Sequence, residues 1–409
     1  MSKSRVKIET NFYIYLITFL SILFPSIAKK NTLKLHSKVS RFFDTRNLLF
    51  TGMGRVAAYN IFKFLINNKK TEIILSPYTL KEIIFAIEYA GGKPIFVDID
   101  IKTGLPKIND VKKAMGKKTA AILLTHLYSD SSNIYRFVNE FKGKVKLIED
   151  TAINFGANIS KSNKLGTLTD FGFFSLGTMK NFMAFNGGIL YCKRKSDFKK
   201  IKLQLKNNVK YSNFLAIKKI ILALCIDIFY NKHFFNFFTY YILLFFQKLN
   251  IKFHEKIIYP GLSYKKNKYL PKHYKYNFYS PFACAAIINL NKINQEIKRK
   301  IYKAKCYEKN LKKDFILVKY KNFKSNAFLE YPILVSQKYK LCKKLLIEGY
   351  DLRHTWYLNN SSKKKFPNSQ FLEDKLITLP THNDISYLDI QMISKKINLN
   401  LNNQLKKLI

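Results

Sequence analysis

Short apolar runs that alternate with helical patterns constrain the fold of this chain more than any other feature of its sequence. The runs are rich in Ile, Leu, Val and Phe, and they lie at residues 72–75, 94–97, 120–125, 145–148, 171–175 and 188–191. Such runs are typical of strands in parallel sheets, which are buried on both faces. Residues 80–90 and 133–141 have helical apolar spacing. The pattern predicts an α/β protein with helices on both faces of a mostly parallel sheet.

The pattern changes at about residue 264, where a second part of the chain begins. Residues 283–311 read as a long basic helix, and strand and helix elements follow it. A chain of 409 residues is long enough for a large domain and a smaller one. We therefore expect an N-terminal segment (1–44), a large domain (45–262) with an apolar helical insertion at about 212–250, and a small α+β C-terminal domain (263–409).

The cysteines and the overall charge exclude some classes of protein. The five cysteines are scattered without CxxC or Cys/His ligand spacing, so we expect no disulfide framework and no metal site. The net charge of +46 would suit nucleic acid or an anionic membrane. However, the lysines are spread along the whole chain, and we find no motif of known nucleic-acid docking geometry. We expect no specific nucleic acid partner, although the charge favours anionic ligands such as nucleotide-linked substrates.

Two apolar stretches lie outside this pattern. Residues 12–24 follow Lys3, Arg5 and Lys7 and are short for a membrane-spanning helix. We rank an interfacial or anchoring helix first, a helix packed on the protein second, and a cleaved signal peptide third. Residues 214–246 are aromatic-rich and interrupted by charges, which suits either a helical hairpin on a membrane surface or a buried dimer interface. We expect a cytoplasmic protein, free or peripheral at the inner face of the membrane.

Lys180 and Asp150 form the strongest candidate for a catalytic site. Asp150 ends the strand pattern at 145–150, and Lys180 follows the run at 171–175. A lysine in a loop after one strand and an acid at the end of another suit pyridoxal 5'-phosphate (PLP), because the lysine holds the cofactor as an imine and the acid holds its ring nitrogen protonated. Taken singly, Lys180 reads as a solvated surface lysine and Asp150 as a helix N-cap.

The short sequence motifs around these residues resemble those of the DegT/StrS family of PLP-dependent nucleotide-sugar aminotransferases, and the resemblance covers roughly residues 45–400. Each motif is a weak signal by itself, but together the motifs occur in the same order and with the same spacing as in the family. They are Phe96-Val-Asp-Ile-Asp100, Thr125-His-Leu-Tyr128, Ile148-Glu-Asp-Thr-Ala152, the run from Gly166 to Ser175 with Lys180 five residues later, Tyr274-Lys-Tyr-Asn277, Phe366-Pro-Asn368 and Leu379-Pro-Thr-His382. The resemblance implies the PLP-dependent transferase fold type I, with glutamate as the expected amino donor and a keto group of a nucleotide-linked sugar as the acceptor. The product would enter glycoconjugate or polysaccharide biosynthesis.

The resemblance also implies roles for individual residues. Lys180 would hold the cofactor and move protons, and Asp150 would pair with its ring nitrogen. Ser175, together with Gly54 and Arg55 in the segment 51–57 before a helix, would bind its phosphate. Asn277 matches an asparagine that reaches the phosphate from the partner subunit, which implies a homodimer with shared active sites. Leu80, or Tyr78 in its place, aligns with the residue that stacks on the ring, and the candidates for substrate or donor contacts are His126, Tyr128, Arg353, His354 and His382.

Some positions depart from the family pattern. Ile153 stands where the family commonly has Gln or His, Met53-Gly54-Arg55 replaces the frequent "SGT", and Phe185-Asn-Gly-Gly188 replaces "GEGG". These departures put the substrate class in doubt more than the fold. They also motivate a second hypothesis, in which a catalytically weak, membrane-associated homologue serves as a scaffold or regulator. A related subgroup of dehydratases has His at the catalytic lysine, and Lys180 argues against it.

Overall fold

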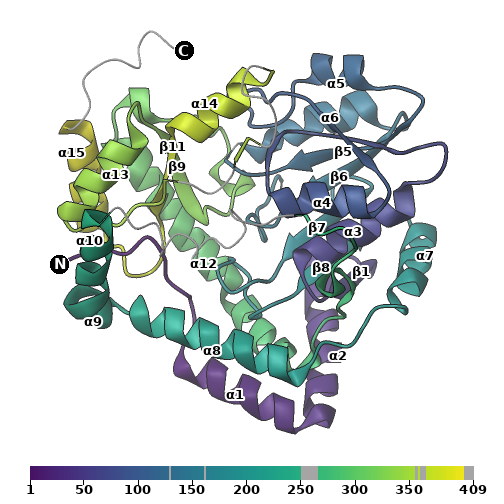
Figure 1. Ribbon diagram of the computed structural model, residues 1–409, viewed down its shortest axis with the longest axis horizontal. Coiled ribbons are helices and arrows are strands. Elements are labelled where there is room, and N and C mark those ends of the chain that lie inside the picture. Colours follow the sequence, from purple (N-terminus) through teal and green to yellow (C-terminus); the bar gives the residue numbers. More distant parts are fainter. Residues whose placement is uncertain (129, 161–162, 250–265, 355–357, 360–364, 400–409) are drawn as a thin grey trace.

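The computed structural model describes residues 1–128, 130–160, 163–249, 266–354, 358–359 and 365–399. The expected domain boundary at 262–263 lies outside the described residues. Figure 1 shows the larger sheet domain at the upper right, a smaller domain at the upper left, and two helices along the lower edge. The chain has an α/β large domain and a smaller α+β domain, as the sequence predicted.

The large domain is built on a seven-stranded mixed sheet. Its strands run in the spatial order β1-β8-β7-β6-β5-β2-β4. Five of them, from β7 to β4 in this order, are parallel neighbours, whereas β8 is antiparallel to both β7 and β1. Their bounds are β1 Leu48–Thr51, β2 Glu72–Leu75, β4 Lys93–Phe96, β5 Thr119–Thr125, β6 Lys146–Asp150, β7 Phe171–Ser175 and β8 Gly188–Cys192. The prediction of a mostly parallel sheet is confirmed, and β1 is an edge strand that the sequence analysis missed.

Helices cover both faces of this sheet because neighbouring residues in its strands point in opposite directions. Leu123 of β5 packs in one hydrophobic cluster with α3 (Gly54–Leu65), α4 (Lys81–Tyr89) and α7 (Lys195–Leu205). Its neighbours Ile122 and Leu124 pack on the other face with α5 (Ile108–Ala114) and α6 (Ile134–Phe141). The apolar runs of the sequence are therefore buried on both sides, as expected for parallel strands.

The smaller domain is joined to the sheet domain by one long helix, α12 (Ala283–Asn310), close to the predicted 283–311. Strands β9 (Glu330–Leu334) and β11 (Leu376–Pro380) form an antiparallel pair, which packs with α12, α13 (Lys338–Ile347) and α15 (Tyr387–Leu399) in one core. The two-residue strand β10 (Leu358–Asn359) pairs with β3 (Tyr78–Thr79) of the large domain, and α14 (Pro367–Lys375) contacts both of these strands.

Further short helices complete the described elements. They are η1 Ser131–Asn133, η4 Lys272–Lys275, η5 Ser280–Phe282, η6 Lys313–Phe315 and η7 Phe323–Ser325.

The two apolar stretches of the sequence form helices that lie together. The first gives α1 (Phe12–Leu23), which a 119° bend separates from α2 (Pro25–Phe43). The second gives α8 (Asn213–Phe229), α9 (Lys232–Phe234), the π-helical turn η2 (Phe235–Thr239) and α10 (Tyr240–Lys248). α1 contacts α8 and α12, and α1 and α8 run side by side at the bottom of Figure 1.

No single helix in the described part of the chain has both the length and the apolar composition that a membrane span needs. Among the described helices, only α1 and α2 taken together have the length and composition for a span, and they are bent at the break between them.

Candidate active site

Lys180 lies in the loop that follows β7, close to the carboxyl end of the central strands. Its backbone N–H donates a hydrogen bond to the Gly177 carbonyl at 3.1 Å. Burial lowers the pKa of the Lys180 amine to about 8; Asp150 opposes this shift, and the nearby cation of Arg353 adds to it. A lysine with this pKa is neutral in a useful fraction of molecules near pH 7, which nucleophilic attack on a carbonyl requires.

Asp150 is the last residue of β6, the strand that pairs with β7 in parallel through Asp150 and Phe173. It is 6% exposed, and its Oδ1 accepts a hydrogen bond from the Ala152 N–H at 3.0 Å. Burial raises the pKa of Asp150 to about 6, while Ala152 and the cation of Lys180 favour its charged form. The structure therefore brings the two residues of the predicted pair into electrostatic contact, in a site where a cationic ligand atom would find a buried carboxylate.

A narrow turn between β1 and α3 lies beside this pair. Met53 precedes α3, and the Thr51 hydroxyl donates to the Met53 carbonyl at 2.9 Å. A Cβ on Gly188 would lie only 2.4 Å from the Met53 oxygen, so this position requires glycine, and a Cβ on Gly54 would be tight at 3.0 Å from the Ser175 Cβ. The turn thus holds the N-terminus of a 12-residue helix against Ser175, and the free N–H groups of such an end bind anions.

Arg55 lies in the first turn of α3, as the sequence predicted for a phosphate contact. Its guanidinium forms an ion pair with Glu82 at 3.4 Å, and its side chain is 30% exposed. The positive charge of Arg55 also acts on two neighbours: it adds to the effect of burial in lowering the pKa of Lys219 and that of His273, the latter to about 4. Arg55 therefore places a positive charge in the first turn of α3, although Glu82 balances it in this structure.

Asn277 lies beside the cradle of its own chain. Its backbone forms an antiparallel bridge with Thr51, and the Gly52 N–H donates to the Tyr276 carbonyl at 2.9 Å. The Asn277 amide donates to the Asn208 carbonyl at 3.3 Å. The resemblance to the family assigns this asparagine to the phosphate cradle of a partner subunit. The homodimer that this role requires stays a prediction.

The two candidates for stacking on the cofactor lie at the start of α4. Tyr78 belongs to β3, is 3% exposed and pairs through its backbone with Asn359 of β10. Burial raises the pKa of its phenol, so Tyr78 is un-ionised. Leu80 caps α4 and packs against the cores on both sides of it. Both residues are thus held rigidly, although neither lines the cavity at Lys180.

The cavity at Lys180 is lined from three directions. The N-terminal segment contributes Arg5 and Glu9, α12 contributes Lys300, and the small domain contributes Glu330. Its volume is about 30 Å³, which leaves room for about one water molecule. Its described lining residues are Arg5, Val6, Lys7, Glu9, Thr178, Met179, Lys180, Lys300, Leu329, Glu330, Arg353, Pro380, Thr381 and His382. The N-terminal residues thus form part of the wall of this cavity.

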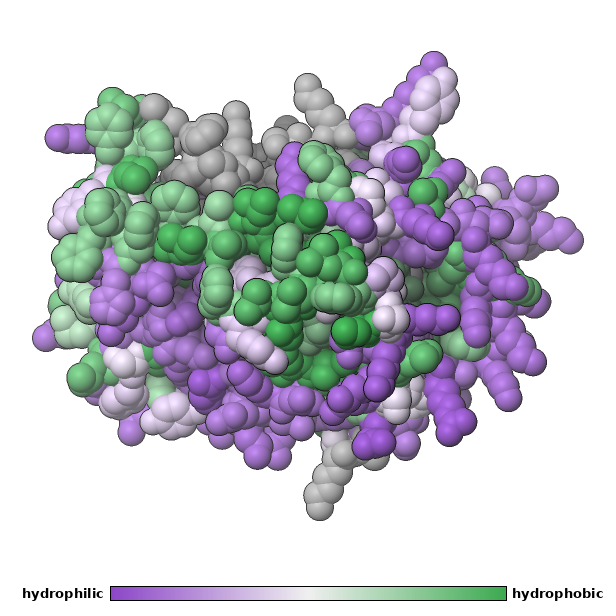
Figure 2. Space-filling model, turned by 90° about the horizontal axis from the view of Figure 1, so that it is seen from below, coloured by the Kyte–Doolittle hydropathy of each residue, from purple (hydrophilic) through white to green (hydrophobic). Residues whose placement is uncertain are grey.

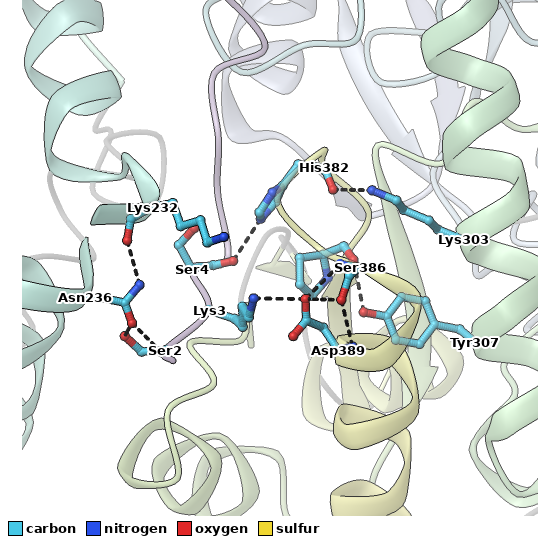
Figure 3. Close-up of polar contacts among 11 residues, drawn as sticks. Ser2, Lys3, Ser4, Lys232, Asn236, Lys303, Tyr307, His382, Ser386 and Asp389 are labelled. Atoms are coloured by element: carbon cyan, nitrogen blue, oxygen red, sulfur yellow. Dashed lines mark hydrogen bonds and ion pairs between the residues drawn. The ribbon is translucent and has the colours of Figure 1, made fainter. Parts of the chain in front are cut away.

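Two of the predicted substrate contacts, Arg353 and His382, belong to this lining. Arg353 is 2% exposed and forms an ion pair with Glu330 at 2.7 Å. His382 donates a hydrogen bond through Nε2 to the Ser4 carbonyl at 2.9 Å, as Figure 3 shows, and burial lowers the pKa of His382 to about 4. Both side chains are therefore engaged with protein groups here.

The other predicted substrate contacts lie apart from this cavity. His126 has its Nε2 3.6 Å from the Glu149 carboxylate, both side chains are fully buried, and burial lowers the His126 pKa to about 3. Tyr128 lines a second, apolar cavity of about 10 Å³ together with Tyr78. The His354 ring packs against the Tyr339 ring at 5.1 Å. In this structure, their positions do not support direct contact with a substrate held at Lys180.

Several residues of the site had no signal in the sequence. Lys300 of α12 donates to the Asn181 side chain at 2.7 Å, and Asn181 in turn donates to the Ile153 carbonyl at 3.2 Å. Arg5 donates through Nε to Asp351 at 2.7 Å. These residues lie far apart in the chain, so only correlated substitutions in an alignment of homologues could have indicated that they lie at one site.

The N-terminal segment reaches this site through contacts with the small domain. The Lys3 amine pairs with Asp389 at 2.9 Å, and the Ser2 hydroxyl donates to Asn236 at 2.7 Å. Residues 2–4 are thereby held between η2 and α15, as Figure 3 shows.

The fold places the protein in a known class. The chain aligns over 97% of its length with the *Escherichia coli* GDP-4-keto-6-deoxy-D-mannose-3-dehydratase with bound hydrated PLP, at a TM-score of 0.70 and 15% identity, covering 99% of that chain. It aligns over 97% with *Helicobacter pylori* PseC, an aminotransferase of pseudoaminic acid biosynthesis, at a TM-score of 0.69 and 14% identity, covering 98% of it. The protein therefore has the PLP-dependent transferase fold type I.

Sequence comparison then shows which family part of the chain resembles. Residues 27–213 match the DegT/DnrJ/EryC1/StrS aminotransferase family, which confirms the resemblance seen in the sequence motifs. The GDP-perosamine synthase of *Escherichia coli* O157:H7 is 31% identical over 138 residues, which is 34% of this chain and 38% of the relative. The dTDP-4-amino-4,6-dideoxy-D-glucose transaminase of *Shigella dysenteriae* is 29% identical over 175 residues, 42% of this chain and 47% of the relative. The matched part thus spans less than half the length of each of these curated relatives.

Proposed function

We propose that this protein is a PLP-dependent aminotransferase that moves an amino group, from glutamate, to a keto group of a nucleotide-linked sugar. The observation that carries the proposal is the partly neutral amine of Lys180 beside the buried carboxylate of Asp150, next to a glycine turn at the N-terminus of α3. The described residues fit PLP, because they offer an amine, an acid and an anion cradle in one place. The family match and the curated names of the relatives support the same reaction.

The bound cofactor would supply an electron sink that stabilises negative charge on the substrate carbon. Lys180 would hold the cofactor through Nζ and, once released, take the proton from the carbon that bears the amino group. Its lowered pKa, about 8, suits a base that works near neutral pH. Asp150, held by the Ala152 N–H, would keep a proton on the ring nitrogen of the cofactor.

Other side chains would bind and orient the two substrates. Gly54, Arg55 and Ser175 would hold the cofactor phosphate, with Asn277 nearby. Arg353 would bind a carboxylate of the donor or a phosphate of the nucleotide. To do so, it would have to exchange its ion pair with Glu330 for one with the substrate. His382 faces the same cavity. Because that cavity is about 30 Å³, residues 5–9 must move before a sugar nucleotide enters.

The proposal includes the assembly and the location of the enzyme. It forms a homodimer with shared active sites, and it works in the cytoplasm or at the inner face of the membrane, where sugar nucleotides are used for glycoconjugates. The alternative of a scaffold or regulator is not favoured, because these relatives carry names of catalytic sugar-modifying enzymes.

The deciding experiment is visible absorption of the protein reconstituted with PLP, followed by a glutamate pulse. We expect a band characteristic of a lysine-linked cofactor that glutamate converts to the pyridoxamine form, and no such band in Lys180→Ala. Lys164→Ala is a matched control, because burial also lowers the pKa of Lys164, whose amine lies over the Phe42 ring and outside the site. A band that persists in Lys180→Ala would refute the proposal. A band that ignores glutamate would refute glutamate as the donor.

A further inference from the structure

Exposed apolar side chains are concentrated in two segments of the chain. Of the 31 exposed large hydrophobic residues among those that the structure describes, 19 lie within residues 12–27 and 214–249. They are Phe12, Tyr13, Leu16, Phe19, Leu20, Leu23, Phe24, Ile27, Phe214, Ile221, Leu222, Ile228, Phe229, Phe237, Phe238, Tyr241, Ile242, Phe245 and Leu249. We call this set the apolar face. Most monomeric proteins expose such residues singly, and a contiguous group marks an interaction site.

The helices show why these side chains gather on one side of the molecule. α1 turns Ile14, Tyr15 and Thr18 inward, and α8 turns Ala216 and Ile220 inward. Because α1 and α8 pack against each other, their opposite sides face outward together. Figure 2 looks onto this side and shows a broad green band of hydrophobic residues from the centre to the left of the view.

The charges within the segments that carry the apolar face are almost all positive. Residues 10–43 and 208–249 contain a single acidic residue, Asp227. It is half-buried and accepts a hydrogen bond from the Tyr15 hydroxyl at 3.3 Å. The exposed basic side chains in these segments include Lys29, Lys30, Lys34, Lys218, Lys232 and Lys248. The segments that carry the apolar face therefore have exposed lysines and no exposed acid.

We propose that the apolar face binds the surface of an anionic lipid bilayer, with its apolar side chains at the level of the headgroups. Apolar and aromatic side chains bordered by lysines are the composition of interfacial helices, whose binding combines apolar burial with attraction to anionic lipids. α1, α8 and α10 have 12, 17 and 9 residues, too few for single spans of about 20. A lipid surface fits better than a second copy of the chain, because two such faces would bring like charges together.

This proposal does not depend on the reaction proposed above. No residue of the apolar face lines the cavity at Lys180. Vesicle binding and the Lys180-dependent absorption band therefore test separate properties of the same protein.

Co-sedimentation of the full chain with vesicles tests the proposal. We compare vesicles of phosphatidylcholine alone with vesicles that contain phosphatidylglycerol, at low and high salt. We expect binding to the anionic vesicles, weakened by salt, and binding at least about tenfold weaker in the triple variant Phe214→Ser/Ile221→Ser/Phe237→Ser. The matched control is Leu203→Ser/Tyr302→Ser/Leu388→Ser, since these three side chains are equally exposed but lie on α7, α12 and α15. Circular dichroism verifies that both variants are folded.

Three outcomes would overturn the proposal. The first is no binding of the wild-type protein to anionic vesicles, and the second is equal binding by the two triple variants. The third is a wild-type dimer in light scattering that becomes monomeric in the face variant, without vesicle binding. That third result would assign the apolar face to contact between two copies of the chain.

Discussion

The site at Lys180 and the apolar face depart in opposite ways from the usual distribution, in which apolar residues are buried and charged residues are exposed. The site buries charged groups: Arg353, Glu330 and Lys300 are each at most 8% exposed. The apolar face does the reverse, because Phe214 is 75% exposed and Phe12 71%. Buried charges and exposed apolar patches are the informative exceptions in a folded protein. Each region is therefore a place where stability alone does not explain the residues.

The comparison also shows how each region is supported. Charged groups at the site have polar partners close to them, as Asp150 has the Ala152 N–H, Arg353 has Glu330 and Lys300 has Asn181. The apolar face has no such compensation within the described chain and needs a partner outside it. Loss of one group should therefore be severe at the site and mild at the face, when the protein is studied alone in solution.

The largest expected effect is that of Asp150→Asn. An amide cannot provide the charge that holds a proton on the cofactor ring, and loss of one partner of a buried charge pair costs about 2–5 kcal/mol. We expect kcat for the proposed reaction to fall about 100-fold or more, measured with glutamate and a keto-sugar nucleotide.

The neighbouring carboxylate gives the control for this change. Glu149 accepts hydrogen bonds from the N–H groups of Gly166 and Leu168, and burial raises its pKa to about 7. Glu149→Gln should lower thermal stability and leave kcat of the folded protein within about tenfold, because alternate residues of a strand face opposite ways. Equal losses of kcat in both variants would contradict the role assigned to Asp150.

Next in size is the effect of Arg5→Ala on stability. Arg5 and Asp351 form an ion pair in which the side chains are 4% and 1% exposed. Removing one partner leaves a buried charge alone, which costs about 3–5 kcal/mol. Lys7→Ala is the matched control, because the Lys7–Asp384 pair is 26% and 22% exposed and such pairs contribute about 0–1 kcal/mol. Denaturant unfolding measures both, and similar losses would mean that the N-terminal segment is not docked in solution.

A smaller effect concerns pH. Burial lowers the pKa of Lys180 from its ordinary 10.5 to about 8, so the reactive neutral amine predominates only above that pH. The rate at which PLP attaches should rise about tenfold per pH unit below 8 and level off above it. Stopped-flow absorption from pH 6 to 9.5 measures this profile. Arg353→Gln should move the midpoint upward, because it removes a nearby cation; a midpoint above 10 in the wild type would indicate a solvated lysine.

The smallest expected effect is that of the apolar-face variant on stability. Phe214→Ser/Ile221→Ser/Phe237→Ser should change the free energy of unfolding by about 0.5 kcal/mol or less per residue, because these side chains already contact water. Leu123→Ala in the sheet core should cost about 2–5 kcal/mol. Urea unfolding in the absence of lipid makes the comparison. A loss of several kcal/mol from the face variant would show that its side chains are packed in solution.

Much of the large domain follows from local sequence. The apolar runs predicted β2, β4, β5, β6, β7 and β8 within one or two residues, because a fully buried strand requires a short, continuous apolar run. The strand β1 (Leu48–Thr51) was missed, and its place at the edge of the sheet is fixed by its pairing with β8. Among the candidate site residues, Lys180 and Asp150 come together as predicted, whereas His126 lies buried against Glu149.

The sequence by itself determined the alternation of strands and helices, the strand end that carries Asp150, the loop that carries Lys180, and the glycine turn at Gly54. These features depend on neighbours within a few residues, so periodicity and residue type are sufficient to find them. Only the tertiary structure decided that Arg5, Lys300 and Glu330 would surround Lys180, and that α1 and α8 would share one exposed side. The physical reason is that packing joins segments hundreds of residues apart, and the order of residues along the chain does not record which faces meet.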